Sequence, residues 1–159
     1  MADEKDMQLA RKVYEELCAA LTERDWKFKR FDEDLTISMG VRGDDLPIDM
    51  VFMVKPEVQV VSLLSPMSFK MSEDKRLDGA VAVAVANYGL INGTFDYDIT
   101  DGEIRFRMVQ SYRESSLGGE VFNYMLLVSA NTIDKYNDRF MMLSKGMIDL
   151  QKFIELDKE

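Results

Sequence analysis

The sequence predicts an α+β fold, a twisted and mostly antiparallel sheet with helices packed on it, in the order α-β-β-β-β-α-β-β-α-α. Three observations predict it. Apolar residues recur at helical spacing at both ends of the 159-residue chain, they alternate with polar residues in between, and Asp101-Gly102 joins two alternating segments as hairpin turns do. No internal repeat or long linker divides the chain, so we expect one domain over residues 1–159. Its core covers about residues 6–144, and a short helix follows over 146–156.

The first predicted helix covers residues 6–23. Its apolar positions share one face: Leu9, Val13, Leu17 and Leu21. Cys18 lies inside this amphipathic pattern, so we expect a buried thiol rather than a reactive one.

Four strands are predicted next. Residues 26–31 and 35–41 alternate as a hairpin around an acidic turn, and 47–54 and 58–64 follow. The third segment is apolar on both faces, with Ile48, Met50, Phe52 and Val54 on one side and Val51 and Met53 on the other. Both faces of the sheet therefore need a cover, which helices or another subunit could supply.

Residues 72–88 are predicted to be a helix, although Val81, Val83 and Val85 alternate with alanine as in a strand. Ser72 is a suitable N-cap, and two acidic residues follow it in the first turn. Because the segment is apolar nearly all round, we expect this helix to be deeply buried. Strands over 94–99 and 103–109 come after it.

From about Gly119 the helical period returns, and Lys145-Gly146 interrupts it before a last short helix. The apolar stripe of the long helix consists of Phe122, Met125, Leu126, Ser129, Ile133, Tyr136, Phe140 and Leu143.

Composition excludes several classes of function. A net charge of −9 repels nucleic acid and anionic membrane surfaces, and the absence of histidine removes triad and ordinary zinc chemistry. No apolar run is long enough to span a bilayer, and the N-terminus lacks the features of a secretory signal, so we expect a cytoplasmic protein. We expect no enzyme activity, no cofactor and no metal, since paired carboxylates are the only acid-base chemistry left.

Two charged segments resemble binding sites for a cation or an acidic peptide. The segment 96–103 has carboxylates but not the spacing of a calcium loop, and a hairpin explains it. Arg105 and Arg107 share one strand face, where they could hold an acidic peptide or form ion pairs with this chain's own carboxylates.

Twelve methionines are many for this length, and flexible thioethers suit surfaces that adapt to varied apolar clients, although core filling is the ordinary interpretation. The candidate partner-binding residues are Met50, Phe52, Val60, Met141, Met142 and Met147.

Several segments occur together in a familiar order. They are Leu21–Lys27, Gly43-Asp44-Asp45-Leu46-Pro47, Ser65-Pro66-Met67-Ser68-Phe69-Lys70 with Glu73–Arg76, Asn87-Tyr88-Gly89-Leu90, and Asp101–Arg107. In this respect the chain resembles the YbjN family, described as bacterial sensory transduction regulators with a fold similar to type III secretion chaperones. The resemblance implies a sheet with helices on one face and an apolar face for dimerisation or a client. It supplies no catalytic residues.

The leading hypothesis is a non-enzymatic, chaperone-like or regulatory module that binds a protein client or itself as a homodimer. The alternative is a regulator that senses a small ligand in a pocket between sheet and helices.

Overall fold

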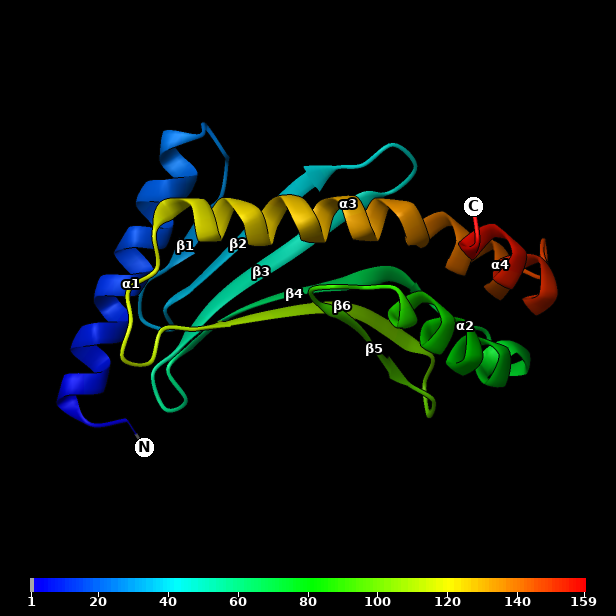
Figure 1. Cartoon of the computed structure of the whole chain (residues 1–159), viewed down its shortest axis with the longest axis horizontal. Helices are drawn as coiled ribbons and strands as arrows, with labels where there is room; N and C mark the ends of the chain where they lie inside the picture. The colour runs from blue at the N-terminus through cyan, green and yellow to red at the C-terminus, as the bar shows by residue number, and fades with distance from the viewer. Residues whose placement is uncertain (1) are drawn as a thin grey trace.

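Six antiparallel strands form one open sheet in the order β1-β2-β3-β4-β6-β5, and helices pack on it (Figure 1). The computed structural model describes residues 2–159, and it confirms the predicted α+β class and the order of elements. The elements are α1 (Glu4–Glu23), β1 (Lys29–Phe31), β2 (Thr36–Arg42), β3 (Pro47–Lys55), β4 (Val60–Lys70), the 3-10 turn η1 (Glu73–Lys75), α2 (Arg76–Tyr88), β5 (Thr94–Asp98), β6 (Glu103–Ser111), α3 (Gly119–Ser144) and α4 (Leu150–Asp157).

The described helices all pack on one face of the sheet. Along β3, Met50 and Phe52 are fully buried on that face, while Val51 and Met53 point to the other face and are only half-buried. In Figure 1, α3 crosses the sheet, α1 lies at one end of it and α2 at the other. The sheet is therefore covered on one side within this chain, and the side that carries Val51 stays open.

The predicted stripe of α3 is confirmed, because every one of its eight members is buried. Around Phe95 of β5 the rings of Phe106, Tyr136 and Phe140 meet edge to face, with centroids 5.1 to 5.5 Å apart. Such contacts add about 0.5–1.5 kcal/mol per pair to the free energy of burial. This cluster fixes α3 over the β5–β6 half of the sheet.

Helix α1 begins at Glu4, slightly before the predicted start at residue 6, and Asp3 caps it. The side chain of Asp3 accepts a hydrogen bond from the backbone N–H of Asp6 at 2.8 Å, which satisfies one of the free donors of the first turn. Cys18 is buried on the inner face, and burial raises the pKa of its thiol. The prediction of a buried, unreactive cysteine holds in both respects.

The β5–β6 hairpin is also confirmed. Gly102 closes the turn at φ +82°, and its N–H donates to Asp98 at 2.7 Å. A Cβ at this position would lie 2.3 Å from the carbonyl oxygen of Met71, so both the conformation and the space require glycine.

Three local predictions were wrong. Strand β4 does not end at residue 64 but continues to Lys70, with a register shift between Pro66 and Lys70, so Phe69-Lys70 belongs to a strand. Ser72 makes no cap, because its hydroxyl donates to the carbonyl of Ser144 on α3. The first hairpin strand is only three residues long.

Candidate protein-binding surfaces

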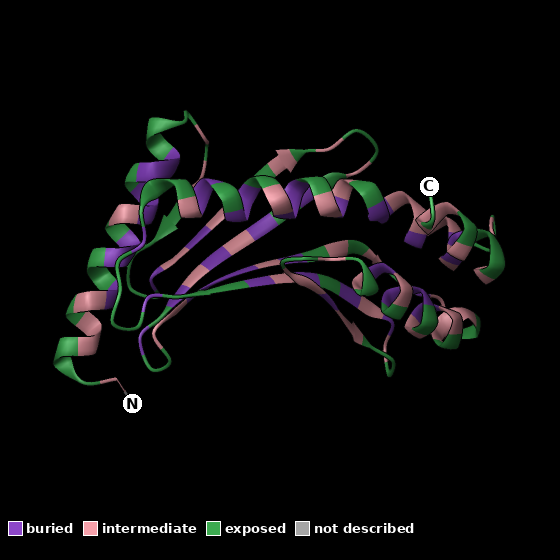
Figure 2. Ribbon diagram, viewed as in Figure 1, coloured by how far each residue is buried: buried purple, intermediate pink, exposed green. Residues whose placement is uncertain are grey.

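Helix α2 carries an exposed apolar stripe, which contradicts the prediction that this helix is deeply buried. Gly79, Ala82, Val83 and Ala86 face the protein, and the opposite side is accessible (Figure 2). We define the outer stripe of α2 as the six accessible apolar positions Leu77, Ala80, Val81, Ala84, Val85 and Tyr88.

The outer stripe is conspicuous for its exposure. Tyr88 is 95% exposed, Leu77 75% and Val81 44%, and Ile91 just beyond the helix is 97% exposed. From Gly79 to Ile91 the chain has no charged residue, although 31% of all its residues are charged. A surface helix normally carries polar residues on its outer face, so the outer stripe of α2 is a candidate binding surface.

Helix α4 turns part of this stripe into a groove. Val81, Ala84, Val85 and Tyr88 of α2 and Ile154, Asp157 and Lys158 at the end of the chain line a surface groove of about 510 Å³. The ring of Phe153 is fully buried and stacks on Phe140 at 5.3 Å, which holds α4 in place. The groove floor is apolar, and its two charged groups lie at the C-terminal end of α4.

The second surface is the open face of the sheet. The pairing register places Val51, Leu64 and Arg107 side by side across β3, β4 and β6, with Met53, Ser62 and Val109 in the adjacent row. Val109 is 44% exposed, and the other apolar members are half-buried. We define the open face by its apolar residues Val51, Met53, Val60, Leu64 and Val109.

Charged residues border the open face near the β5–β6 turn. Asp96 accepts two hydrogen bonds from Arg107, at 2.9 and 3.0 Å, and one from Arg105 at 3.1 Å. These guanidinium groups, Arg107 foremost, hold the pKa of Asp96 below its usual range, and partial burial acts in the opposite direction. Of the two interpretations left open for the arginines, the structure supports ion pairing with the chain's own carboxylate.

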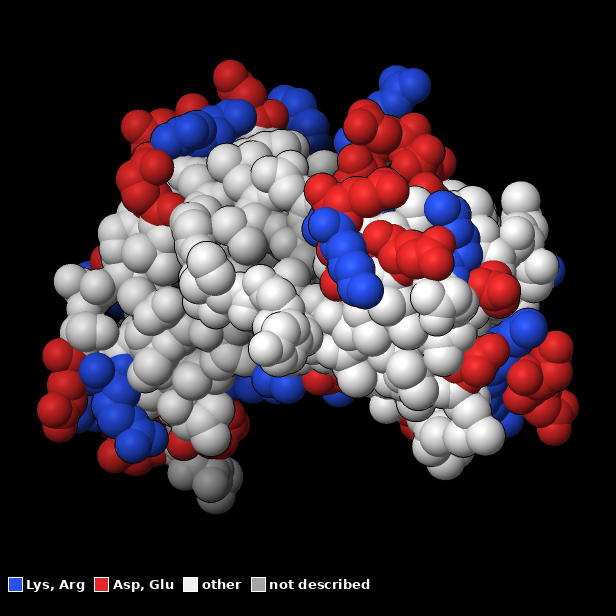
Figure 3. Space-filling model, turned by 45° about the vertical axis from the view of Figure 1, so that its right-hand side comes forward, with Lys and Arg blue, Asp and Glu red and all other residues white. Residues whose placement is uncertain are grey.

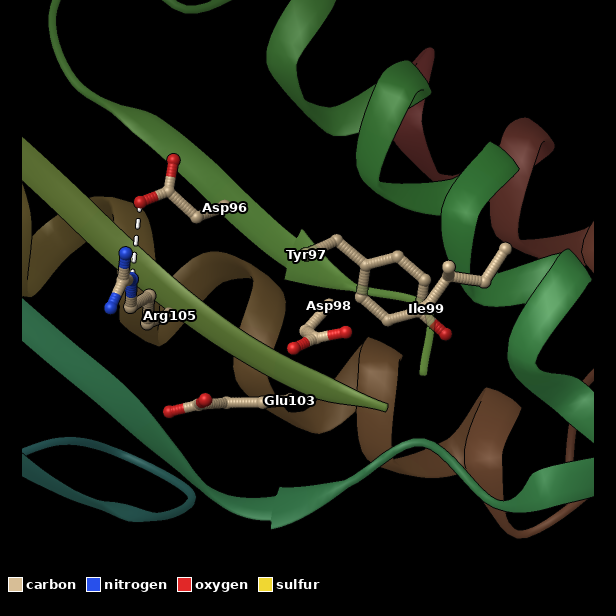
Figure 4. A pocket seen from close by; sticks show the side chains of 6 residues that line it. All are labelled: Asp96, Tyr97, Asp98, Ile99, Glu103 and Arg105. Atoms are coloured by element: carbon tan, nitrogen blue, oxygen red, sulfur yellow. Dashed lines mark hydrogen bonds and ion pairs between the residues drawn. The ribbon is translucent and has the colours of Figure 1, made fainter. Parts of the chain in front are cut away.

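A pocket of about 350 Å³ lies beside this ion pair (Figure 4). Asp98 and Glu103 are directly opposite each other across the two strands, and the pKa of Asp98 is lowered by hydrogen bonds from the side chain and backbone of Thr100. Among the described residues no group of three or more acidic, cysteine or histidine side chains could hold a metal ion.

The segments that carried the family resemblance hold α3 on the sheet. In the Gly43–Pro47 turn, the N–H of Asp44 donates to Asp134 of α3 at 2.8 Å, and a Cβ at Gly43 would lie 2.3 Å from the same carboxylate. At the other end of α3, Ser144 accepts from the N–H of Ser72 at 2.9 Å. These motifs are therefore structural, in agreement with their lack of reactive side chains.

The predicted partner-binding residues are divided between core and surface. Met50 and Phe52 are fully buried beneath the helices, so a partner of the folded chain could not reach them. Val60 lies on the open face. Met141 and Met142 are half-buried near the end of α3, and Met147 in the turn after α3 is 67% exposed.

Sequence reasoning missed the outer stripe of α2. Its signal is the uncharged run from Gly79 to Ile91, which by itself predicts burial within the chain. A helix that is apolar on two opposite sides can bury both sides within its own chain, or it can bury one side there and the other in an interface. The sequence does not distinguish these two arrangements.

These features define an α+β protein with helices on one side of a single sheet and two accessible apolar surfaces, one on α2 and one on the sheet. None of the helices over residues 2–159 has the length and apolar character needed to cross a membrane. Residues 14–141 match the YbjN family, "Putative bacterial sensory transduction regulator", and the chain belongs to that family. Helix α4 lies beyond the matched residues.

Solved structures show the same fold. YbjN of E. coli, described as "a putative transcription regulator", is 12% identical, with a TM-score of 0.56 over 76% of this chain and 85% of that chain. A chain of the HopA1-SchA chaperone-effector complex is 12% identical, with a TM-score of 0.56 over 87% and 99%. A chain of the ExsC-ExsE complex is 14% identical, with a TM-score of 0.58 over 82% and 94%. No curated protein matches the sequence.

Proposed function

We propose that this chain is a non-enzymatic, chaperone-like protein-binding module of the bacterial cytoplasm, which acts as a homodimer in a regulatory role. The observation that carries the proposal is the exposed outer stripe of α2 in an otherwise highly charged chain. Covering apolar surface yields about 25 cal/mol per Å², so residues such as Leu77 and Tyr88 favour association.

The surface distribution of charge supports this proposal. Figure 3, which turns the α2 side of the molecule toward the viewer, shows broad uncharged areas in the middle and at the lower right, with charged residues gathered at the upper right and along the margins. Depletion of charged residues is typical of the core of a protein interface.

The open face is the surface that we assign to a client segment. Val51, Met53 and Leu64 offer apolar contacts on adjacent strands, and Val109 extends them toward the sheet edge. A segment laid across the strands would cover these side chains without displacing a helix. That a chain of similar fold occurs in a chaperone-effector complex is consistent with this role.

The alternative of a small-ligand sensor has less support. Two pockets of about 510 and 500 Å³ are grooves open to solvent rather than enclosed cavities between sheet and helices. An open apolar groove suits a protein segment better than a small molecule, which usually needs most of its surface covered.

The test is affinity capture of the tagged protein from its native lysate, with mass spectrometry of the bound material. We expect a stoichiometric protein client, which Val109→Asp on the open face should release. Val58→Asp is the matched control, because Val58 is 51% exposed in the turn between β3 and β4, outside the paired strands. Capture of no protein, or equal capture by both variants, would contradict the assignment of the client to the open face.

A further inference from the structure

Strands β3 and β4 stop pairing beneath α3, before either strand ends. Their last paired residues on this side are Val51 and Leu64, although both strands extend further. Pro66 has no N–H to donate to β3, and the hydroxyl of Ser65 instead donates to the carbonyl of Asp49 at 2.6 Å. A side-chain hydrogen bond therefore holds the two strands together where their backbone ladder stops.

The same part of β4 also departs from regular pairing with β6. The pairs that flank the shift are Pro66 with Arg105 and Lys70 with Glu103. Residues 67–69 of β4 therefore lie opposite position 104 alone, and such a bulge leaves backbone N–H and C=O groups without ladder partners. Because backbone groups that lie away from solvent are almost always hydrogen-bonded, this segment requires partners other than the neighbouring strands.

Helix α3 and these diverging strands surround a small cavity. Its lining includes Leu46, Pro47, Ser65 and Pro66 from the two strands and the turn before β3, and Ile133 and Asn137 from α3. The positions open to a water-sized sphere add up to about 10 Å³. One buried water needs roughly 10–15 Å³ by this measure. The cavity therefore has room for one water molecule and not for an organic ligand.

Asn137 is the polar side chain that α3 contributes to this cavity. The residue is 2% exposed, and its Oδ1 accepts from the N–H of Asp138 at 2.7 Å. Its Nδ2 is buried and has no hydrogen-bond partner among residues 2–159. Since a buried donor without an acceptor is costly, such groups almost always bind protein or ordered water. The cavity beside Asn137 is the place for the missing acceptor.

We propose that this cavity binds one water molecule, which bridges Asn137 of α3 to Ser65 of β4. The water accepts a hydrogen bond from Nδ2 of Asn137. It donates to the hydroxyl of Ser65, which keeps lone pairs free after its own proton has gone to Asp49. The second proton of the water suits a backbone carbonyl of the bulge. Buried waters make about three hydrogen bonds, and these groups supply that number.

The chemistry of the lining favours water over a small ion. A metal or ammonium cation has no lone pair with which to accept from Nδ2 of Asn137. Chloride could accept this hydrogen bond, but none of the described residues that line the cavity is charged. An ion of either sign would therefore be buried without a counter-charge, which is costly.

The water completes a row of polar contacts along one side of α3. Asp134 accepts from the N–H of Asp44 at 2.8 Å, and Ser144 accepts from the N–H of Ser72 at 2.9 Å. Asn137 lies between them on the same side of the helix. The outer two contacts are direct, whereas the middle one needs a bridge because the strands diverge beneath it. None of these residues belongs to the outer stripe of α2 or to the open face.

A high-resolution crystal structure, together with magnetic relaxation dispersion of the solvent water, tests the proposal. We expect the density of one water about 2.7–3.2 Å from Nδ2 of Asn137, and a long-lived water in solution. Asn137→Leu keeps a similar branched shape but removes the donor, so the density and its contribution to the relaxation should both be lost. Ser129→Ala is the matched control. Ser129 is also buried on α3, with an Oγ that has no partner among the described residues, but it does not line the cavity.

The control should keep the water, and several results would overturn the proposal. They are the absence of density beside Asn137 in the wild type, density that persists in Asn137→Leu, and loss of the water in Ser129→Ala. A density that strengthens when bromide replaces chloride would show an anion and would also reject the water. If Asn137→Leu does not fold, the wild-type density and relaxation still decide, because the proposal requires both.

Discussion

Helices α2 and α3 lie on the same face of the same sheet, yet they use their apolar residues differently. Helix α3 buries its main apolar face, and its outer side mixes charged residues such as Glu120 and Lys135 with two exposed apolar ones, Tyr124 and Leu127. Helix α2 has an inner apolar face and an outer one, and only the inner one is covered. The comparison shows that an apolar stripe alone does not identify the core, because α2 has one such stripe buried and another exposed.

The largest expected effect is the difference in stability between one alanine substitution on α3 and one on α2. Phe140→Ala on α3 should lower the free energy of unfolding by about 3–5 kcal/mol, because its ring is fully buried among Phe95, Tyr136 and Phe153. Tyr88→Ala on α2 should change it by less than about 0.5 kcal/mol in the monomer. Denaturant unfolding of both variants at several protein concentrations separates folding from association. Similar losses for the two would mean that the outer side of α2 is packed within the chain.

The difference between the helices also explains how far sequence reasoning could reach. The stripe of α3 was predicted residue by residue, because apolar residues that recur along one side of a helix indicate which side packs on the core. For α2 the same reasoning predicted burial of the whole helix, because both of its sides are apolar. The sequence pattern does not show what each side of the helix faces in the folded chain. Met50 and Phe52 were placed among the partner-binding residues for a related reason, since β3 is apolar on both faces and only the fold decides which face the helices cover.

The candidate site was predicted less well than the fold. Val60 and Met147 are accessible, but Tyr88 and Leu77, which are among the most exposed apolar residues, are absent from the candidates. Likewise Ser65–Lys70 was expected to lead into a helix, whereas pairing with β6 extends the strand to Lys70. Pairing with a strand some 40 residues later is a long-range effect that local sequence does not encode.

An intermediate effect tests how α2 is attached to the sheet. Asn87 accepts from the backbone N–H of Phe95 at 2.7 Å and donates to its carbonyl at 2.9 Å, so α2 satisfies the free edge of β5. Asn87→Ala should cost about 1–3 kcal/mol, because two partly buried backbone groups lose their partner. Asn92→Ala, which removes an exposed hydrogen bond to Tyr124, is the control and should cost much less. Hydrogen exchange at Phe95 reports the loss directly, and an unchanged rate would show that the edge is protected by other means.

The smallest effect concerns the side of the sheet that neither helix covers. Asp96→Asn should lower the free energy of unfolding by about 0.2–1 kcal/mol at neutral pH, since its partners Arg105 and Arg107 are largely exposed. The pKa of Asp96 is depressed in the folded chain, so its stabilising effect is fully present above the unfolded value of about 3.9 and is lost as pH falls through the lower folded value. The stability curves of the wild type and the variant should therefore converge in acid. A stability difference that persisted at the lowest pH would mean that Asp96 acts through packing rather than through its charge. The open face would then be a more rigid surface than the ion pairs at its border imply.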